Sequence, residues 1–171
     1  MLINYMEAQM NIINNYEDQS LKNIRKANIE DLEIIVKFNY NLAKQTEDLE
    51  LDLEILTEGV AAILNDPEKG QYYVYVIDNK VVGQIMHTYE WSDWRNGTFF
   101  WVQSVYVDEG HRRKGIFKEL YNHVKEICDN DEGIAGIRLY VEKENFNAKA
   151  TYKSLGMHEC NYHMYEYEIN R

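Results

Sequence analysis

Apolar residues recur along the chain at two spacings, one typical of helices and one typical of strands. The helical spacing follows Asn28, which together with Asp31 three residues later is typical of a helix start. It recurs after Thr57, a residue that can cap a helix, and after Gly115. The pattern predicts helices over residues 28–44, 57–67, 115–128 and 147–155.

Runs rich in aromatic and β-branched residues predict the strands. Asp78-Asn79 lies between two such runs and is typical of a hairpin turn, and Asn96-Gly97 is a second turn signal. The predicted strands cover residues 21–26, 72–77, 81–89, 98–107, 134–141 and 157–169, the last run as one or two strands. We therefore expect an α/β fold, with a mixed, mostly antiparallel sheet of six to seven strands flanked by about four helices.

The length of 171 residues fits a single domain. Residues 1–20 contain several asparagines and no clear turn signal, so we expect an N-terminal extension there and one folded domain over residues 21–171. With 45% hydrophobic and 13% aromatic residues, the chain can bury a core, which argues against disorder.

The net charge of -11 argues against nucleic acid and anionic membranes as partners, because both are bound by basic surfaces. No apolar run is long enough for a membrane span, and the first residues do not resemble a signal peptide. Cys128 and Cys160 have no neighbouring ligands at metal-binding spacing, so we expect neither a metal nor a disulfide framework. These features together predict a cytoplasmic location.

One basic turn stands out in this acidic chain. Three cations and a glycine, residues 112–115, follow the predicted strand 98–107 and precede the apolar stripe of the next helix. Helix N-termini present unpaired N–H groups and a partial positive charge, so such a turn suits an anion. It is not a Walker A loop, because the full Gly-x4-Gly-Lys-Ser/Thr sequence does not occur there, and it is not a dinucleotide fingerprint, because the Gly-x-Gly-x-x-Gly spacing is missing. A solvated basic turn is the alternative at this point.

A second motif follows in the last predicted helix, and the two motifs together resemble the GCN5-related N-acetyltransferases (GNAT superfamily). The resemblance covers about residues 21–169. It implies a GNAT-like fold and an N-acetyltransferase that uses acetyl-CoA as its cosubstrate and a primary amine as its acceptor. The residues that carry it are Arg112-x-x-Gly115 and Asn145-x-x-Ala148-x-x-x-Tyr152-x-x-Leu155-Gly156-Met157.

By position, the resemblance implies a role for several residues. Backbone groups of Val105, Tyr106 and Val107 would lie along the pantetheine arm of acetyl-CoA. Asn145 would contact the pantetheine or the far arm of the cofactor, and Tyr152 would lie near the thioester and protonate the leaving thiolate. The amides expected to hold the pyrophosphate belong to Arg112, Arg113, Lys114, Gly115, Ile116 and Phe117.

Two residues depart from the family pattern. Members usually have glycine or alanine where Phe117 stands, and a bulky side chain there could narrow the pyrophosphate cradle or point into the helix packing. Gln103 stands where some members place a glutamate, and a glutamine cannot act as a base. These departures support an alternative function, a non-catalytic acyl-CoA-binding regulatory module.

The acceptor side is predicted from acids and aromatics outside the two motifs. Residues 44–54 contain one lysine and five acids, a local charge of -4, which would attract a cationic amine. A solvated acidic loop is the alternative. An aromatic residue in the loop before strand 98–107 could add a cation–π contact. The residues expected to bind the acceptor are Glu47, Asp48, Trp91 and Asp93. Glu90 is placed first as the general base, and the alternative carboxylates are Asp93, Glu47, Asp48, Glu50 and Asp52.

These patterns predict direct acetyl transfer to a small-molecule primary amine, with a preference for cationic amines similar to that of diamine and polyamine acetyltransferases. No covalent enzyme intermediate is expected, because Cys128 lies on an apolar stripe and Cys160 lies beyond the motifs. An amine on a peptide or protein is the alternative acceptor. The C-terminal strands could supply an edge for a homodimer.

Overall fold

The computed structural model describes residues 23–167 and residue 169. The chain divides into two compact units, one that ends at Tyr140 and one that begins at Val141. The extension predicted over residues 1–20 lies outside the described residues. That residues 21–171 form one domain stays a prediction.

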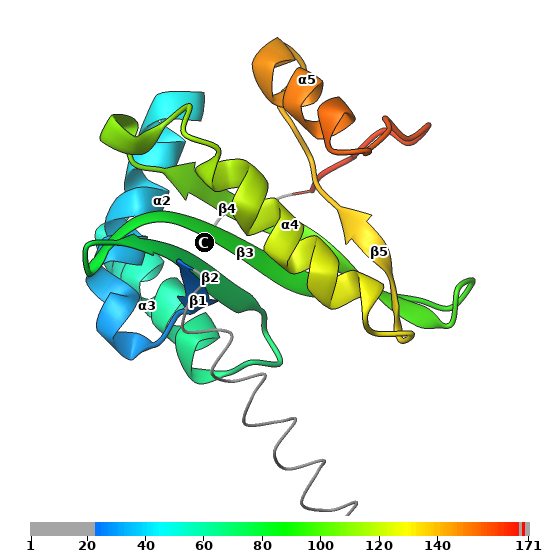
Figure 1. Cartoon of the computed structure of the whole chain (residues 1–171), viewed down its shortest axis with the longest axis horizontal. Coiled ribbons are helices and arrows are strands. Elements are labelled where there is room, and N and C mark those ends of the chain that lie inside the picture. Colours follow the sequence, from blue (N-terminus) through cyan, green and yellow to red (C-terminus); the bar gives the residue numbers. More distant parts are fainter. Residues whose placement is uncertain (1–22, 168, 170–171) are drawn as a thin grey trace, which may run out of the picture. The chain divides into compact units, whose positions relative to one another are not determined.

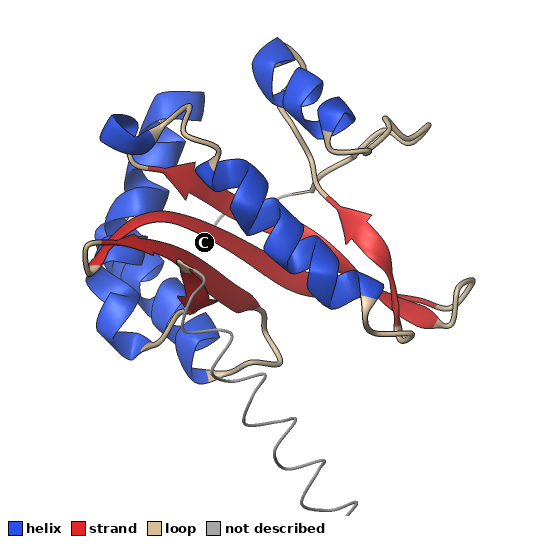
Figure 2. Ribbon diagram, viewed as in Figure 1, coloured by secondary structure: helices blue, strands red, loops and turns tan. Residues whose placement is uncertain are grey.

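The first unit contains a sheet of five strands in the order β1-β2-β3-β4-β5 (Figures 1 and 2). The first four strands pair antiparallel and β4 pairs parallel with β5. This confirms the predicted mixed, mostly antiparallel sheet. The strands are β1 (Ile24–Lys26), β2 (Gln71–Ile77), β3 (Lys80–Ser92), β4 (Gly97–Val107) and β5 (Ile134–Arg138).

Helices cover both faces of this sheet. In Figure 1, α4 crosses one face, and α2 and α3 lie on the other. The second unit contains α5, so the four predicted helices are all present. Their bounds are α2 (Leu32–Glu47), α3 (Leu53–Asn65), α4 (Ile116–Asp129) and α5 (Phe146–Ser154), with short 3-10 turns at η2 (Ile29–Asp31) and η3 (Glu109–His111). Among the described helices, none has both the length and the apolar character needed to cross a bilayer.

The apolar stripe of α4 builds one of two cores. Ile116, Leu120 and Val124 are at most 3% exposed and pack against strand residues that include Ile85 and Phe100. The other core joins α2 and α3 to the opposite face of the sheet, with Ile35, Val60, Tyr72, Val74 and Met86 at its centre. Burial of side chains of this size removes apolar surface from water, which is the main term that holds such layers together.

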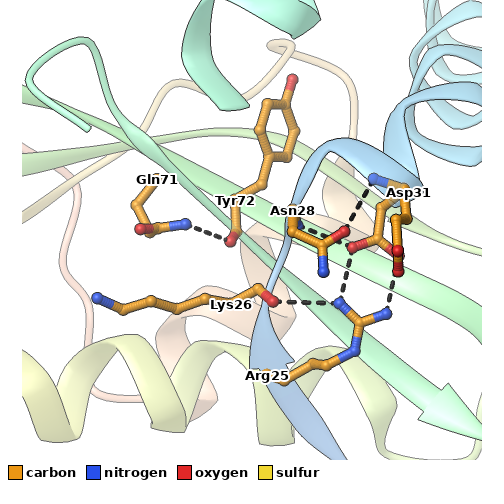
Figure 3. Close-up of polar contacts among 7 residues, drawn as sticks. Arg25, Lys26, Asn28, Asp31, Gln71 and Tyr72 are labelled. Carbon is orange, nitrogen blue, oxygen red and sulfur yellow. Dashed lines mark hydrogen bonds and ion pairs between the residues drawn. The ribbon is translucent and has the colours of Figure 1, made fainter. Parts of the chain in front are cut away.

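The predicted cap is present at the start of η2, the 3-10 turn that leads directly into α2. The side chain of Asn28 accepts a hydrogen bond from the Glu30 amide at 2.8 Å, and Asp31 accepts one from the Asn28 amide at 2.9 Å. Arg25 in β1 donates to both carboxylate oxygens of Asp31, at 2.7 and 2.8 Å (Figure 3). The cap therefore also fastens β1 to the beginning of the helical layer.

The helix predicted from Thr57 begins earlier, at Leu53. Asp52 caps it, because its Oδ1 accepts from the amides of Glu54 and Ile55 at 2.9 and 3.1 Å. Thr57 instead donates its hydroxyl to the Leu53 carbonyl within the helix at 2.6 Å. Both residue types can cap a helix, and a start at Asp52 adds one more turn to the packed layer.

The loop predicted after residue 89 is shorter than expected, because only residues 93–96 form the turn between β3 and β4. β3 continues to Ser92, which pairs with Gly97 at the hairpin end, so three more residues join the sheet. The strand predicted over residues 134–141 ends at Arg138.

The strands predicted over residues 157–169 are absent from the described part of that segment, so the described sheet has five strands rather than six or seven. Residues 158–167 are all exposed. Alternation alone does not make a strand, because the strand's peptide groups also need a partner.

Candidate functional site

β4 contains a bulge near its end. Met86 pairs with Gln103, whereas Gln84 pairs with Tyr106, so β4 has one extra residue in this interval. Ser104 adopts a left-handed conformation with φ of 48°, which is costly for a residue with a Cβ. Bulges bend a strand and re-aim its groups, so the bulge separates the first part of β4 from its last residues.

A buried polar network supports the bulge. Gln84 is fully buried (0% exposed) and donates from Nε2 to the Ser104 carbonyl at 3.1 Å and to Asn39 Oδ1 at 2.6 Å. Asn39 in α2 donates in turn to the Tyr72 hydroxyl at 2.9 Å. Polar groups are costly to bury unless they are paired, so this network specifies the shape of the backbone at Ser104.

Beyond the bulge, the outer edge of β4 is open within the first unit. β5 pairs only with the beginning of β4, from Thr98 to Trp101, and ends at Arg138. Among the described residues of this unit, no strand pairs with residues 105–107 on that side. An unpaired edge is a row of N–H and C=O groups that an extended molecule can bind.

The open edge leads into the basic turn, and the turn leads into α4. Arg113 and Gly115 have φ of 63° and 86°, and no side chain caps the start of α4. The first amides of α4 are therefore uncapped, and the helix dipole adds partial positive charge at the same point. Strand edge, turn and helix start together present groups that suit a ligand with an extended polar part and an anionic part.

The three cations of the turn differ in their contacts. Arg112 donates from Nε to the Val107 carbonyl at 3.0 Å, and Lys114 donates from Nζ to the Gly110 carbonyl at 2.9 Å. The exposed side chain of Arg113 makes no hydrogen bond or ion pair with any described residue. Arg113 is thus available to an anion, whereas Arg112 and Lys114 brace the turn.

The bulky residue at the helix start lies along α4. The ring of Phe117 is 6.2 Å from that of Tyr121, one turn further on, measured between centroids. Its neighbour Ile116 is buried in the core. Of the two interpretations that the sequence left open, this geometry favours packing along the helix.

The predicted base and two predicted acceptor residues lie at the other end of β4. Glu90 pairs across the hairpin with Phe99 and forms an ion pair with Arg138, whose guanidinium lies 3.9 Å from the Phe99 ring centroid. At the usual strand rise, Phe99 is about 17 Å from the bulge. Trp91 and Asp93 are exposed and nearer still to the hairpin tip. The structure does not bring these residues to the basic turn.

The acids of the α2–α3 loop are partly bound within the loop itself. Lys44 pairs with Asp48 at 3.0 Å and with Glu50 at 3.3 Å, and the hydrogen bonds to these carboxylates raise the pKa of Lys44. Asp52 is occupied as the cap of α3. The Glu47 carboxylate makes no pair with any described residue. The loop is acidic as predicted, but less of its charge is open to a ligand.

Gln103 directly precedes the bulge and donates from Nε2 to the Thr88 hydroxyl at 2.9 Å. Its other amide atom, Oε1, accepts no hydrogen bond from the described residues. The side chain beside the bulge is therefore a neutral acceptor, which can orient a donor group but cannot remove a proton.

Asn145 and Tyr152 both lie in the second unit. Asn145 caps α5, because its Oδ1 accepts from the Ala148 amide at 3.0 Å. Tyr152 lies within the same helix, and burial raises the pKa of its hydroxyl above the usual value of 10. The phenol therefore keeps its proton at neutral pH.

Of the other reactive side chains, His87 is buried in the core, whereas Cys128 and His111 are half-buried. His87 is 1% exposed and stacks on Phe100 with ring centroids 3.8 Å apart, and burial lowers its pKa to about 4. Burial also raises the pKa of the Cys128 thiol to about 11, which disfavours the reactive thiolate. His111 pairs with Asp108 at 3.2 Å. Within the described residues, no group of three or more His, Cys, Asp or Glu side chains could hold a metal ion.

Three residues that shape this site were missed from the sequence. Asn39 and Gln84 are polar residues inside apolar helix and strand patterns, and such an interruption is a usable signal for a buried network. The sequence pattern predicts a loop at Gln45, but α2 continues to Glu47. Nothing in the local sequence signals that Gln45 contacts the basic turn.

Comparison with known proteins adds to this geometry. The family model described as "Acetyltransferase (GNAT) family" matches residues 30–157. An N-alpha-acetyltransferase from Saccharolobus solfataricus is 31% identical over 142 residues, which are 77% of this chain and 77% of that protein.

Solved structures share the fold. A possible acetyltransferase from Clostridium difficile 630 is 65% identical with a TM-score of 0.82, covering 86% of this chain and 97% of its own. A ribosomal-protein-alanine N-acetyltransferase from Brucella melitensis biovar Abortus 2308 has a TM-score of 0.69 at 14% identity, covering 86% and 98%, and at that identity it shows the fold alone. With the strand, turn and helix start of the site, these matches show that the chain belongs to the GNAT family of acetyltransferases.

Proposed function

We propose that this protein transfers the acetyl group of acetyl-CoA to a primary amine. The observation that carries the proposal is the path from the open edge of β4, past the basic turn, to the uncapped start of α4. Acetyl-CoA has an extended amide-containing arm followed by a pyrophosphate, in the same order as the strand edge and the helix start. Membership of the GNAT family supports the same donor.

The residues along this path fit that donor. Peptide groups of residues 105–107 would bind the amides of the pantetheine arm as a neighbouring strand would. The amides of residues 112–117 and the unpaired guanidinium of Arg113 would bind the pyrophosphate. Two of these backbone groups already have partners in the protein: the Arg112 amide donates to the Glu109 carbonyl at 3.3 Å, and the Val107 carbonyl accepts from Arg112 Nε at 3.0 Å.

We propose direct transfer between the two substrates. The amine nitrogen bonds to the thioester carbonyl carbon, the C–S bond breaks, and the departing thiolate takes a proton. Tyr152 would donate that proton, since its raised pKa keeps the phenol protonated at neutral pH. Asn145 would contact the donor through the amide nitrogen that its capping role leaves free. The raised pKa of Cys128 supports a path without an acyl-enzyme.

The ammonium must lose a proton before it attacks, and Glu90 is the base we propose. One Glu90 oxygen binds Arg138, whereas the other, Oε2, is buried without a hydrogen-bond partner. The distance of about 17 Å between its strand pair and the bulge implies that the proton travels through water rather than by direct contact. Gln103, beside the bulge, would orient the amine through its free Oε1.

Two classes of acceptor are supported by different observations. The similarity to an N-alpha-acetyltransferase supports the α-amine of a peptide or protein, which we place first. The acidic α2–α3 loop supports a small cationic amine, although Lys44 neutralises part of its charge. In either case the proposed acceptor contacts are Glu47, Asp48, Trp91 and Asp93.

Other sequence predictions are carried forward as proposals: a single acetyltransferase domain over residues 21–171, a cytoplasmic location, and a homodimer joined through the C-terminal residues. The second candidate function is a non-catalytic acyl-CoA-binding module. It is favoured by the neutral Gln103 beside the bulge.

Thiol release from acetyl-CoA tests the proposal. The full chain is incubated with peptides that carry different first residues, with diamines, and with neutral amines. We expect thiol release together with an acetylated amine, and loss of both with Tyr152→Phe. Tight CoA binding without thiol release on any amine would instead support the non-catalytic module.

A further inference from the structure

Gln45 links α2 to the basic turn, which lies more than sixty residues later in the chain. Its Oε1 accepts a hydrogen bond from Arg112 Nη2 at 2.6 Å, and its Nε2 donates to Glu109 Oε1 at 3.0 Å. A longer contact of 3.4 Å joins Nε2 to the Tyr106 hydroxyl. The side-chain amide of Gln45 therefore contacts the cation Arg112, the anion Glu109 and Tyr106 near the end of β4.

The two ends of the amide are matched to two different partners. The oxygen faces a guanidinium that can only donate, and the nitrogen faces a carboxylate that can only accept. A glutamate at this position would bind Arg112 but place its charge against Glu109, and an apolar residue would lose both bonds. The contact thus depends on a side-chain amide.

Arg112 is fixed in place by this and other contacts. Its Nε donates to the Val107 carbonyl at 3.0 Å, and its guanidinium lies 5.4 Å from the centroid of the Tyr106 ring. Its Nη1 also lies 3.9 Å from Glu109. With its donors directed at the protein, Arg112 serves as a brace between β4, α2 and the turn, and Arg113 is left for the ligand.

Apolar packing does not hold this turn. None of the residues from 109 to 115 is buried, and two of them, Arg113 and Gly115, have left-handed backbone conformations. The shape of the turn therefore depends on polar contacts. Gln45 supplies them from a helix that is itself packed on the sheet through Ile35.

We infer that Gln45 is a positioning residue for the pyrophosphate of acetyl-CoA, an inference that rests on the proposed function. It holds Arg112 and Glu109 so that the amides of residues 112–117 are directed at the phosphates before the ligand arrives. Donors that are already held in place bind a ligand more tightly, because the conformational entropy of ordering them is lost on folding and not on binding. Gln45 itself touches neither the thioester nor the amine in this scheme.

The test compares Gln45→Leu with the adjacent Thr46→Leu. Both positions are exposed on α2, but Thr46 bonds only to the Leu42 carbonyl within its own helix. Two acyl donors are used: acetyl-CoA, and S-acetylpantetheine, which lacks the pyrophosphate. The measurements are the Kd of CoA by calorimetry and the steady-state constants for each donor.

We expect Gln45→Leu to raise the Kd of CoA and the KM of acetyl-CoA by about tenfold, the scale of one hydrogen bond to a charged group. The kcat with acetyl-CoA should change by less than about twofold, and so should kcat/KM for S-acetylpantetheine. Both changes are well below the effect of about tenfold expected on the binding of CoA. Thr46→Leu should leave all of these unchanged. An equal loss with both donors, or an unchanged Kd of CoA, would overturn the inference. The Kd comparison requires no turnover, so it decides the role of Gln45 even if the protein acetylates none of the amines.

Discussion

Gln84 donates a hydrogen bond from its buried side chain to the backbone carbonyl of Ser104, at 3.1 Å. The bond joins β3 to the residue of β4 whose backbone is left-handed. It supports the bulge at which the register between β3 and β4 shifts by one residue, before pairing resumes at Tyr106. The open edge that we assign to the acetyl donor begins one residue further on.

Substitution of Gln84 by leucine should therefore weaken both the fold and the site. The change removes two buried hydrogen bonds but also removes Oε1, which is buried without a partner, so we expect a loss of about 1–2 kcal/mol in the free energy of unfolding. KM for acetyl-CoA should rise. Urea denaturation measures the first effect, with Gln103→Leu as control, since Gln103 bonds only to the Thr88 side chain. Equal losses in the two variants would contradict the role of Gln84.

The buried His87 should make the protein sensitive to mild acid. Its pKa is about 4 in the folded protein and about 6.5 when exposed, so between these values the unfolded chain binds a proton that the folded chain does not. The free energy of unfolding therefore falls as pH drops from 6.5 to 4, by up to about 1.4 kcal/mol per pH unit from this group.

His87→Phe should remove this dependence, because phenylalanine keeps the ring stacked on Phe100 and does not titrate. The variant should gain stability relative to the original protein as pH falls from 7 to 4.5, as measured by urea denaturation at several pH values. His111→Asn serves as control, because His111 is paired at the surface of the turn. A constant difference at every pH would rule out the assigned protonation behaviour.

The Arg25–Asp31 pair should stabilise the protein at neutral pH and lose its effect in acid (Figure 3). Burial acts to raise the pKa of Asp31, but the hydrogen bonds from Arg25 and Asn28 and the charge of Arg25 outweigh it, so this pKa lies below 3.8. The stabilisation is thus complete above about pH 4 and declines as pH falls through the folded pKa.

We expect Arg25→Met to lower the free energy of unfolding by about 1–3 kcal/mol at pH 7, since Asp31 stays buried while Arg25 is partly exposed. The loss should shrink near pH 3. Lys26→Met, the neighbouring substitution, makes a suitable control, because the Lys26 side chain does not contact Asp31. A loss that stays the same down to pH 3 would speak against the ion pair as its cause.

Replacement of Tyr152 by phenylalanine should affect turnover more than binding. Loss of a general acid typically lowers kcat by about 100-fold or more, while the Kd of CoA should hardly change. Pre-steady-state thiol release and calorimetry measure the two quantities separately. If kcat is unchanged, another group protonates the thiolate.

Much of the fold could be predicted from local patterns. The Asn28 cap and the turn at Asp78-Asn79, where φ is 47° and 60°, depend on residues adjacent in the chain, and both are present. The apolar stripe of α4 could be predicted for a similar reason, because the helical spacing of its apolar residues alone indicates which positions face the sheet. The motif at residues 112–115 could be placed because a strand and a helix flank it.

The features that were missed depend on contacts between distant residues. A serine at position 104 gives no sign of a left-handed backbone, because that conformation is stabilised by Gln84 and Asn39 from other elements. The contact of Gln45 with Arg112 spans sixty-seven positions. Glu90 was predicted from its residue type and loop position, which do not reveal the ion pair with Arg138.

Amide hydrogen exchange with and without acetyl-CoA tests the central claim most directly, since exchange reports the protection of individual backbone segments. The account predicts that acetyl-CoA slows exchange at residues 105–107 and 112–118, while β2 at Gln71–Ile77 is unaffected. Protection confined to other segments, in a protein that binds acetyl-CoA, would contradict the assignment of the open β4 edge and the basic turn as the donor site.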